Sequence, residues 1–265
     1  KWLLLRRTSQ TLILLAFLAG PWFGVWIVKG NLASSLTLDT LPLTDPFLLL
    51  QLLASGHRPE IAAFVGVAWV LAFYLVVGGR VFCAWVCPMN PVTDAAAWLR
   101  RRLGLKGGHA PDGATRYWLL AAILVAAALS GKLVWEWVNP VSMLQRGLIF
   151  GFGLGWALVL GIFLYDLLLA GRGWCSHLCP MGACYALIGK TALWRVSAGG
   201  RSRCNDCMDC FAVCPEHQVI RPALKAKGQA HPLILDSACT NCGRCVDVCS
   251  QDVFRLGSRF NRSEQ

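Results

Sequence analysis

The sequence predicts a polytopic α-helical membrane protein, built as two repeated helical hairpins and followed by a small cysteine-rich α+β domain. Three observations lead to this fold class. The 265 residues are 56% hydrophobic and only 15% charged, against about 25% charged in an average soluble domain. Long uncharged stretches occupy the first part of the chain, and most of the 13 cysteines lie between Cys204 and Cys249. We therefore expect a membrane domain over residues 1–196 and a polar domain over 197–265.

Four apolar stretches are long enough to cross a hydrocarbon core about 30 Å thick at a rise of about 1.5 Å per residue. We expect membrane spans at about residues 11–28, 61–79, 117–135 and 147–169. A fifth stretch, Leu41–Leu53, is shorter and contains two prolines, so we expect a short helix in the membrane interface. In the fourth span Gly147, Gly151 and Gly155 recur every four residues, which favours close packing against a neighbouring helix.

Lys and Arg residues are concentrated on one side of these spans. They fill the segment before the first span, the loop between the second and third, and the stretch after the fourth. The other side has only Lys29, Arg58, Lys132 and Arg146. The positive-inside rule then predicts that both termini are cytoplasmic. The formal net charge of +11 is therefore mostly a topology signal, and we expect the partner to be the lipid bilayer and not nucleic acid.

One motif, Gly-Arg-x2-Cys-x3-Cys-Pro-Met, follows both the second and the fourth span. It contains Cys83 and Cys87 in the first copy and Cys175 and Cys179 in the second, at an offset of 92. Residues i and i+4 share a helix face, so each copy would present two thiols together. A pseudo-twofold axis along the membrane normal would gather all four thiols at the cytoplasmic face, where a disulfide is not expected. These thiols could hold a metal or a further cluster, undergo redox chemistry, or pack the interface.

The outer loops repeat as well. A Pro-x3-Leu-Gln segment ends at Gln51 in the first hairpin and at Gln145 in the second, at an offset of 94. Both repeated motifs occur in the same order, so the two hairpins are copies of one unit with the same orientation in the membrane.

The C-terminal cysteines follow the spacing Cys-x2-Cys-x2-Cys-x3-Cys twice. This spacing is that of bacterial ferredoxins with two [4Fe–4S] clusters, in which the fourth cysteine of each run ligates the cluster of the other run. We expect one cluster on Cys204, Cys207, Cys210 and Cys249, and the other on Cys239, Cys242, Cys245 and Cys214. Zinc sites prefer two-by-two spacing. The domain is therefore predicted to be an electron relay.

Other redox cofactors have no signal in the sequence. None of the five histidines lies inside a predicted span, and Cys-x-x-Cys-His, GxGxxG and P-loop patterns are absent from the sequence. We expect neither haem nor flavin, and the membrane-side redox partner is then most simply a lipid-soluble quinone. The outer loops mix hydrogen-bonding groups with aromatic side chains, and their candidate quinol-site residues are Asp45, Gln51, Glu136, Gln145 and Arg146. Asp166, inside the fourth span, is expected to pair with Arg172 or Arg80, and the alternative is that it relays a proton.

With four spans, two Cys-x3-Cys-Pro motifs and a two-cluster domain, the chain resembles the NapH/MauN family of ferredoxin-type membrane proteins. Its outer segments beginning at Asn31 and Asn139 are similar to those of the NapH branch. The resemblance implies a membrane subunit of a quinol dehydrogenase in the bacterial inner membrane. Such a subunit oxidises menaquinol or ubiquinol and passes electrons to a NapG-like ferredoxin-type subunit, to a c-type cytochrome and on to periplasmic nitrate reductase.

Two other functions are compatible with the same motifs. A membrane ferredoxin of this kind could act in the assembly or maturation of redox-metal cofactors. It could also be a structural anchor for a periplasmic partner, in which case loss of the clusters would be tolerated.

Overall fold

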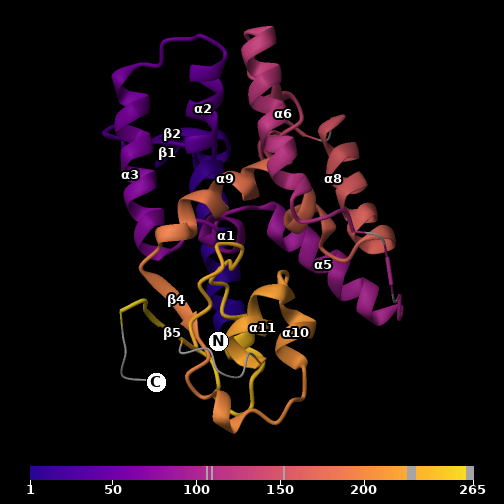
Figure 1. Ribbon diagram of the computed structural model, residues 1–265. Helices are drawn as coiled ribbons and strands as arrows, with labels where there is room; N and C mark the ends of the chain where they lie inside the picture. The colour runs from indigo at the N-terminus through magenta and orange to yellow at the C-terminus, as the bar shows by residue number, and fades with distance from the viewer. Residues whose placement is uncertain (106, 109, 152, 226–230, 261–265) are drawn as a thin grey trace. The chain divides into compact units, whose positions relative to one another are not determined.

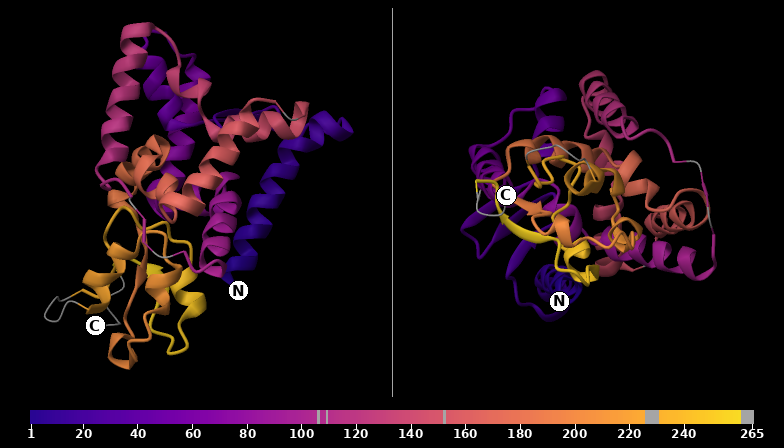
Figure 2. Two further views of the ribbon diagram at one scale, coloured as in Figure 1. Left: turned by 90° about the vertical axis from the view of Figure 1, so that its right-hand side faces the viewer. Right: turned by 60° about the horizontal axis from the view of Figure 1, so that its bottom comes forward.

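The computed structural model describes residues 1–265 except 106, 109, 152, 226–230 and 261–265 (Figures 1 and 2). The chain forms two compact units. Unit 1 comprises residues 1–9, 73–86 and 185–265, and unit 2 comprises residues 10–72 and 87–184. Unit 1 therefore contains the predicted C-terminal domain together with segments that precede it in the sequence by more than a hundred residues.

Unit 2 is almost entirely helical. Its elements include α2 (Pro46–Ala54), α5 (Met89–Arg102), α6 (Thr115–Ser130), η1 (Val134–Trp137), α7 (Pro140–Phe150), α8 (Gly155–Leu164), η2 (Tyr165–Leu169) and η3 (Trp174–Leu178). Three helices have residues in both units: α1 (Trp2–Phe23), α3 (Ile61–Val77) and α9 (Pro180–Ile188). Within unit 2, α2 packs beside α6 (Figure 1), and α7 packs against α8.

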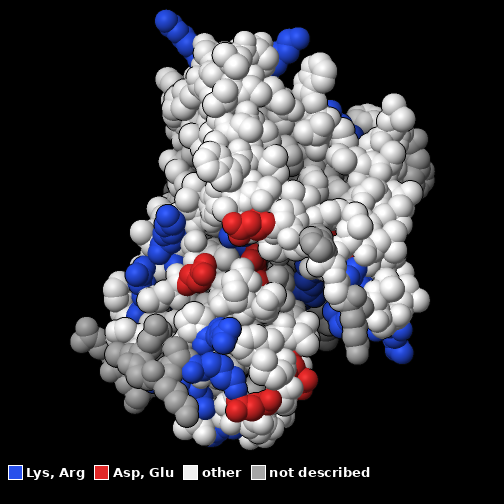
Figure 3. Space-filling view, turned by 45° about the vertical axis from the view of Figure 1, so that its right-hand side comes forward, with Lys and Arg blue, Asp and Glu red and all other residues white. Residues whose placement is uncertain are grey.

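Each of the four predicted spans corresponds to an apolar helix. Among the described residues, α1 is the one helix long and apolar enough to cross a membrane, and the apolar helices Ile61–Val77, Thr115–Ser130 and Gly155–Leu169 are shorter. Large apolar side chains are exposed on them, for example Trp118 (75%) and Leu129 (85%). Figure 3 shows a broad surface with hardly a charged side chain over the end that holds α2, α3 and α6. Four membrane crossings stay a prediction.

The prediction of one continuous helix over residues 147–169 is wrong. Helix α7 ends at Phe150, because Gly151 adopts a φ of 93° that glycine accepts at no steric cost, and α8 starts only at Gly155. Gly147 and Gly155 still act in packing, whereas a Cβ on Gly151 would meet nothing within 4 Å. A Cβ on Gly147 would lie 2.2 Å from Nε1 of Trp156, on the neighbouring helix.

The first outer segment folds differently from the expected helix over 41–53. Three short antiparallel strands, β1 (Val28–Gly30), β2 (Ser34–Thr37) and β3 (Leu41–Thr44), come before α2. Helix α2 starts only at Pro46, where Asp45 caps it by accepting the N–H of Phe47.

Unit 1 contains a small α+β domain around the C-terminal cysteines. Strand β4 (Trp194–Ser197) pairs antiparallel with β5 (Arg255–Ser258). Between them lie short helices, namely α10 (Asp209–Val213), α11 (Ile220–Lys225) and α12 (Arg244–Val248), with 3-10 turns η5 (Arg201–Arg203) and η6 (His217–Val219). Val196, Ile220, Ile234 and Phe254 form its core together with Cys210 and Cys245. The helix α4 (Val81–Trp85) and the turn η4 (Gly189–Thr191) belong to the same unit.

Candidate iron–sulfur sites

The two Cys-x2-Cys-x2-Cys loops bend in the same way. In the first, Asp206 and Met208 have φ values of 61° and 64°; in the second, Asn241 and Gly243 have 46° and 71°. Asp, Asn and Gly are the residues that tolerate this left-handed region best. In each loop the two residues with positive φ are separated by one residue without it. This alternation turns successive backbone N–H groups towards one concave side, as in the backbone nests that hold anionic iron–sulfur groups. The loops therefore fit a negatively charged cluster.

The first predicted set of thiols is brought together at the surface. Cys204, Cys207, Cys210 and Cys249 line one open hollow at the surface. Cys249 comes from the second cysteine run and completes the group formed by the first three. Cys207 is exposed to solvent, whereas Cys210 is buried.

The second predicted set is enclosed. Cys242 and Cys245 are buried, each 8% exposed, and Cys214 and Cys239 are half-buried. The pKa of Cys239 is raised to about 12, chiefly by burial, and the neighbouring Cys242 thiol contributes to this rise. The pKa of Cys214 is raised by burial and then by Cys242 and Cys239, so this thiol from the first run lies within electrostatic reach of the second. Since the ligands of a metal cluster are thiolates, loading this site must release protons.

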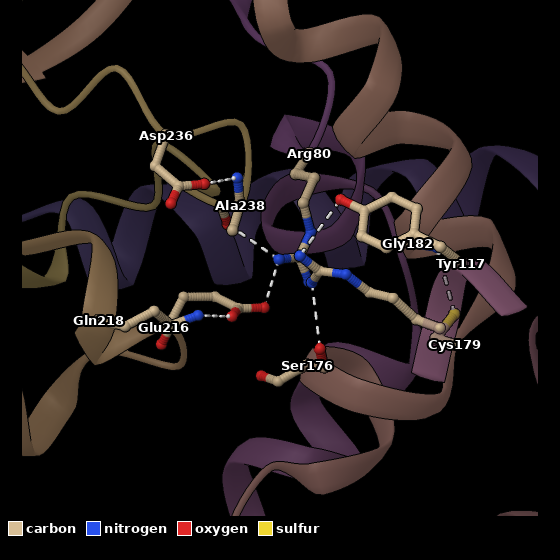
Figure 4. Close-up of polar contacts among 10 residues, drawn as sticks. Arg80, Tyr117, Ser176, Cys179, Gly182, Glu216, Gln218, Asp236 and Ala238 are labelled. Atoms are coloured by element: carbon tan, nitrogen blue, oxygen red, sulfur yellow. Dashed lines mark hydrogen bonds and ion pairs between the residues drawn. The ribbon is translucent and has the colours of Figure 1, made fainter. Parts of the chain in front are cut away.

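A buried ion pair links the two chain segments that carry Cys214 and Cys239 of the second site (Figure 4). Arg80 and Glu216 are 1% and 2% exposed and form this pair. The Nη1 of Arg80 also donates to the backbone carbonyl of Ala238 at 2.8 Å. Glu216 follows Cys214 by two residues and Ala238 directly precedes Cys239. Arg80 comes from the first Gly-Arg-x2-Cys motif, so this motif contacts the cysteine domain within unit 1.

Asn241, inside the second cysteine loop, makes further contacts to the same region. Its Nδ2 donates to the carbonyl oxygens of Val77 at 2.9 Å and Trp194 at 3.0 Å. Its own carbonyl accepts from Nε1 of Trp85 at 3.2 Å. The loop is therefore fixed to the end of α3, to β4 and to the last residue of α4. Sequence reasoning missed Asn241, Trp85 and Glu216, because nothing local marks contacts over such separations.

The start of α1 covers the other side of this loop. The carboxylate of Asp247 accepts the N–H groups of Trp2 at 3.1 Å and Leu3 at 2.9 Å. A Cβ on Gly243 would lie 2.4 Å from the indole of Trp2, so the indole packs on the backbone of the loop. The enclosed site is thus bounded by segments from all three parts of unit 1.

The Cys-x3-Cys-Pro cysteines lie in or next to short helical turns. Cys179 follows η3 and has an extended backbone, as expected before a proline, and its Sγ accepts the N–H of Gly182 at 3.4 Å. Cys175 lies inside η3, while Cys83 and Cys87 fall in different units. Across the described residues, no three His, Cys, Asp or Glu side chains converge on a single-ion site. The role of these four thiols stays a prediction.

The candidate quinol residues are found in several environments. Gln51 and Gln145 are 0% and 1% exposed, and Arg146 is exposed. Asp45 is the N-cap of α2. Glu136 accepts from Asn139 at 3.0 Å and from Ser142 at 3.0 Å.

Within the described part of the chain, Asp166 does not form the expected ion pair with Arg172 or Arg80. Its carboxylate accepts the N–H of Trp174 at 2.9 Å. Arg172 pairs instead with Asp94 at 3.4 Å, and Arg80 is taken up by Glu216. The prediction failed because both arginines have a nearer acid that lies far away in sequence.

Comparisons with known proteins place this chain among proteins with 4Fe-4S binding domains. A family described as a 4Fe-4S binding domain matches residues 60–106 and 149–199, and a 4Fe-4S dicluster domain matches 203–253. The ferredoxin-type protein NapH of Haemophilus influenzae is 50% identical over 99% of this chain and 92% of its own. NapH of Escherichia coli is 51% identical over 98% and 91%. The methylamine utilization ferredoxin-type protein MauN of Paracoccus denitrificans is 54% identical over 98% and 91%. No solved structure matches the chain.

Proposed function

The chain belongs to the NapH/MauN family of ferredoxin-type proteins, and from this premise we propose that it is the membrane subunit of a quinol dehydrogenase. It oxidises menaquinol or ubiquinol and transfers the electrons through iron–sulfur centres. One quinol loses two electrons and two protons and leaves as quinone; two bound [4Fe–4S] clusters would supply two one-electron acceptors. The protons pass to water.

One observation carries the proposal, namely the different exposure of the two thiol sets. The set of Cys239, Cys242, Cys245 and Cys214 is enclosed by Arg80, Asn241 and the start of α1. The set of Cys204, Cys207, Cys210 and Cys249 opens to solvent at Cys207. Electrons that enter at the enclosed site can leave at the open one, where a partner protein can approach. The same eight residues are the proposed cluster ligands.

Two buried arginines favour electron entry at the enclosed site. Arg80 and Arg195 are 1% and 2% exposed, and both lower the pKa of Cys239 after the larger effect of burial has raised it. Fixed positive charge in a poorly solvated site stabilises added negative charge. We expect these side chains to raise the affinity of the enclosed site for an electron.

The exposed apolar side chains of α3 and α6 support a multi-pass protein of the bacterial inner membrane with cytoplasmic termini. In this setting a lipid-soluble donor reaches the protein from the bilayer. The downstream partners proposed from the family are a NapG-like ferredoxin-type subunit, a c-type cytochrome and periplasmic nitrate reductase. Related membrane ferredoxins that mature metal cofactors remain the alternative, and the reaction with quinol separates the two.

The test combines metal analysis with spectroscopy on anaerobically purified full-length protein. We expect about eight irons per chain and a reduced-cluster EPR signal within the turnover time after addition of a menaquinol analogue. Additional iron would assign a ligand role to Cys83, Cys87, Cys175 and Cys179. Clusters that dithionite reduces but quinol does not, even with the ferredoxin-type partner present, would refute the dehydrogenase and favour maturation.

A further inference from the structure

Two glutamines occupy equivalent positions in the two repeats of unit 2. Gln51 is the sixth residue of α2 and Gln145 the sixth residue of α7. Both helices begin with proline, and both are capped by the residue before it, Asp45 in α2 and Asn139 in α7. Both glutamines are buried, at 0% and 1% exposure. The repeat in sequence is thus also a repeat in local structure.

Each glutamine contacts the outer segment of the other repeat. The Oε1 of Gln51 accepts the backbone N–H of Trp135, in η1, at 3.0 Å. The Oε1 of Gln145 accepts the N–H of Leu32, between β1 and β2, at 3.1 Å. These contacts fix which end of each amide is oxygen, because the opposite orientation would bring two donors face to face. The free ends are therefore the NH₂ groups.

Both NH₂ groups are buried and have no hydrogen-bond partner among the residues that the structure describes, and the same holds for the indole Nε1 of Trp135. Leaving a buried donor unsatisfied costs about 1–3 kcal/mol. A single unsatisfied donor is explained by local packing. The same unsatisfied donor at both equivalent positions indicates that the two NH₂ groups serve to bind an acceptor. Native buried polar groups without a partner are uncommon and call for such an explanation.

The surroundings define the chemistry of that acceptor. The indole of Trp135 and the ring of Phe47 lie 6.1 Å apart between centroids. Phe47, one helical turn before Gln51, and Leu144, directly before Gln145, are both buried. Two hydrogen bonds link α2, through η1, to the start of α7. Trp135 bonds to Gln51, and the following residue, Glu136, accepts from Asn139 at the start of α7. An acceptor here needs oxygen atoms on a flat apolar body.

We propose that the NH₂ groups of Gln51 and Gln145 donate hydrogen bonds to the two oxygens of one quinone or quinol ring held between α2, η1 and α7. The proposal rests on the quinol dehydrogenase function and assigns its substrate site. A 1,4-quinone has two equivalent oxygens on opposite sides of a flat ring, which suits two equivalent donors from a repeated structure. The amides bind and orient the ring.

The experiment measures binding of menadione to the full-length cluster-loaded protein by quenching of tryptophan fluorescence. Gln51→Leu and Gln145→Leu should each weaken binding by about two- to tenfold, the value of one neutral hydrogen bond. Gln10→Leu is the matched control, because Gln10 is 2% exposed but its Nε2 already donates to Asn90 at 3.2 Å. It should leave the affinity for menadione unchanged.

A ligand with one oxygen makes the test sharper. With 2-methyl-1-naphthol, one glutamine has no oxygen to bind, so only one of the two leucine variants should weaken binding. Where a leucine variant loses iron, Gln51→Glu or Gln145→Glu replaces it, since the carboxylate keeps the acceptor for Trp135 or Leu32 and removes the NH₂ group.

The outcomes separate this site from the function it serves. Wild-type protein that binds menadione and is reduced by quinol, with variants that bind equally well, would overturn the site and leave the function intact. The same result with higher thermal stability of the variants would show that the amides only face buried water. Wild-type protein that neither binds menadione nor accepts electrons from quinol would overturn both.

Discussion

Replacing Arg80 by glutamine should selectively open the enclosed iron–sulfur site. The substitution removes the cation that pairs with Glu216 and the donor to the carbonyl of Ala238. Glu216 would remain 2% exposed without its counter-ion. Breaking a buried ion pair from one side costs about 3–5 kcal/mol, because the remaining charge is stranded in a poorly solvated place.

This free-energy cost raises the population of the form in which the site is open. At 1.4 kcal/mol per factor of ten, an open form that releases Cys214 and Cys239 becomes roughly a hundred- to several thousand-fold more populated. The relevant assay is anaerobic loss of iron from the full-length protein to a chelator in excess. When local opening is fast and reversible, the rate of loss follows the population of the open form.

The second repeat supplies the matched control. Arg172 is the equivalent residue, but its pair with Asp94 has side chains 12% and 14% exposed, so Arg172→Gln should change iron loss far less. Adding Glu216→Gln to Arg80→Gln removes the stranded charge and should recover part of the loss. Iron loss from Arg80→Gln at the wild-type rate, or equal to that of Arg172→Gln, would refute the reasoning.

Three further predictions follow from the same unit. Gly79→Ala should abolish stable folding or cluster retention, because its Cβ would clash with the carbonyl oxygen of Tyr185. The Cβ of Gly257→Ala, the control, meets nothing within 4 Å. Thermal unfolding of both variants checks this. In cluster-free protein, a thiol reagent should label exposed Cys207 well before buried Cys242, as read by peptide mass spectrometry, and equal labelling would contradict the assigned exposure. Iron uptake by cluster-free protein should accelerate as the pH rises from about 7 to 9. Thiolates are the ligands, and because burial raises the pKa of Cys239 to about 12, the thiolate fraction still increases over this range. A rate of uptake that falls with pH would contradict this prediction.

The cysteine loops were predictable because their chemistry is local. Three thiols within seven residues already restrict the cofactor, and Asp206 and Asn241 stand where the backbone turns left-handed. Gln51 and Gln145 were identifiable as polar residues in a repeated outer segment. Their reciprocal contacts to Leu32 and Trp135 were not, since these depend on how the outer segments fold.

Long-range pairing and helix breaks were beyond sequence reasoning. Arg80 and Glu216 are 136 residues apart, and no periodicity in the chain marks such a pair. Apolarity alone made residues 147–169 look like one span, although Gly151 ends the helix by its positive φ. The three-stranded sheet before α2 was missed for a similar reason, because its strands are only 3 or 4 residues long.

The two repeats are alike in their outer segments and different in their Gly-Arg-x2-Cys-x3-Cys-Pro motifs, and this difference fits the proposed electron path. Gln51 and Gln145 keep the same position, burial and free NH₂ group, as two donors to one ligand with two equivalent oxygens require. Arg80 and Arg172 have the same place in their motif, yet Arg80 is buried against the cysteine domain and Arg172 pairs with Asp94 within unit 2. A ligand with two equivalent oxygens requires its two donor residues to stay alike. A single iron–sulfur domain, in contrast, can be contacted by only one of the two copies of the motif. The asymmetry of the arginines therefore assigns the first motif, and not the second, as the contact of the enclosed cluster site.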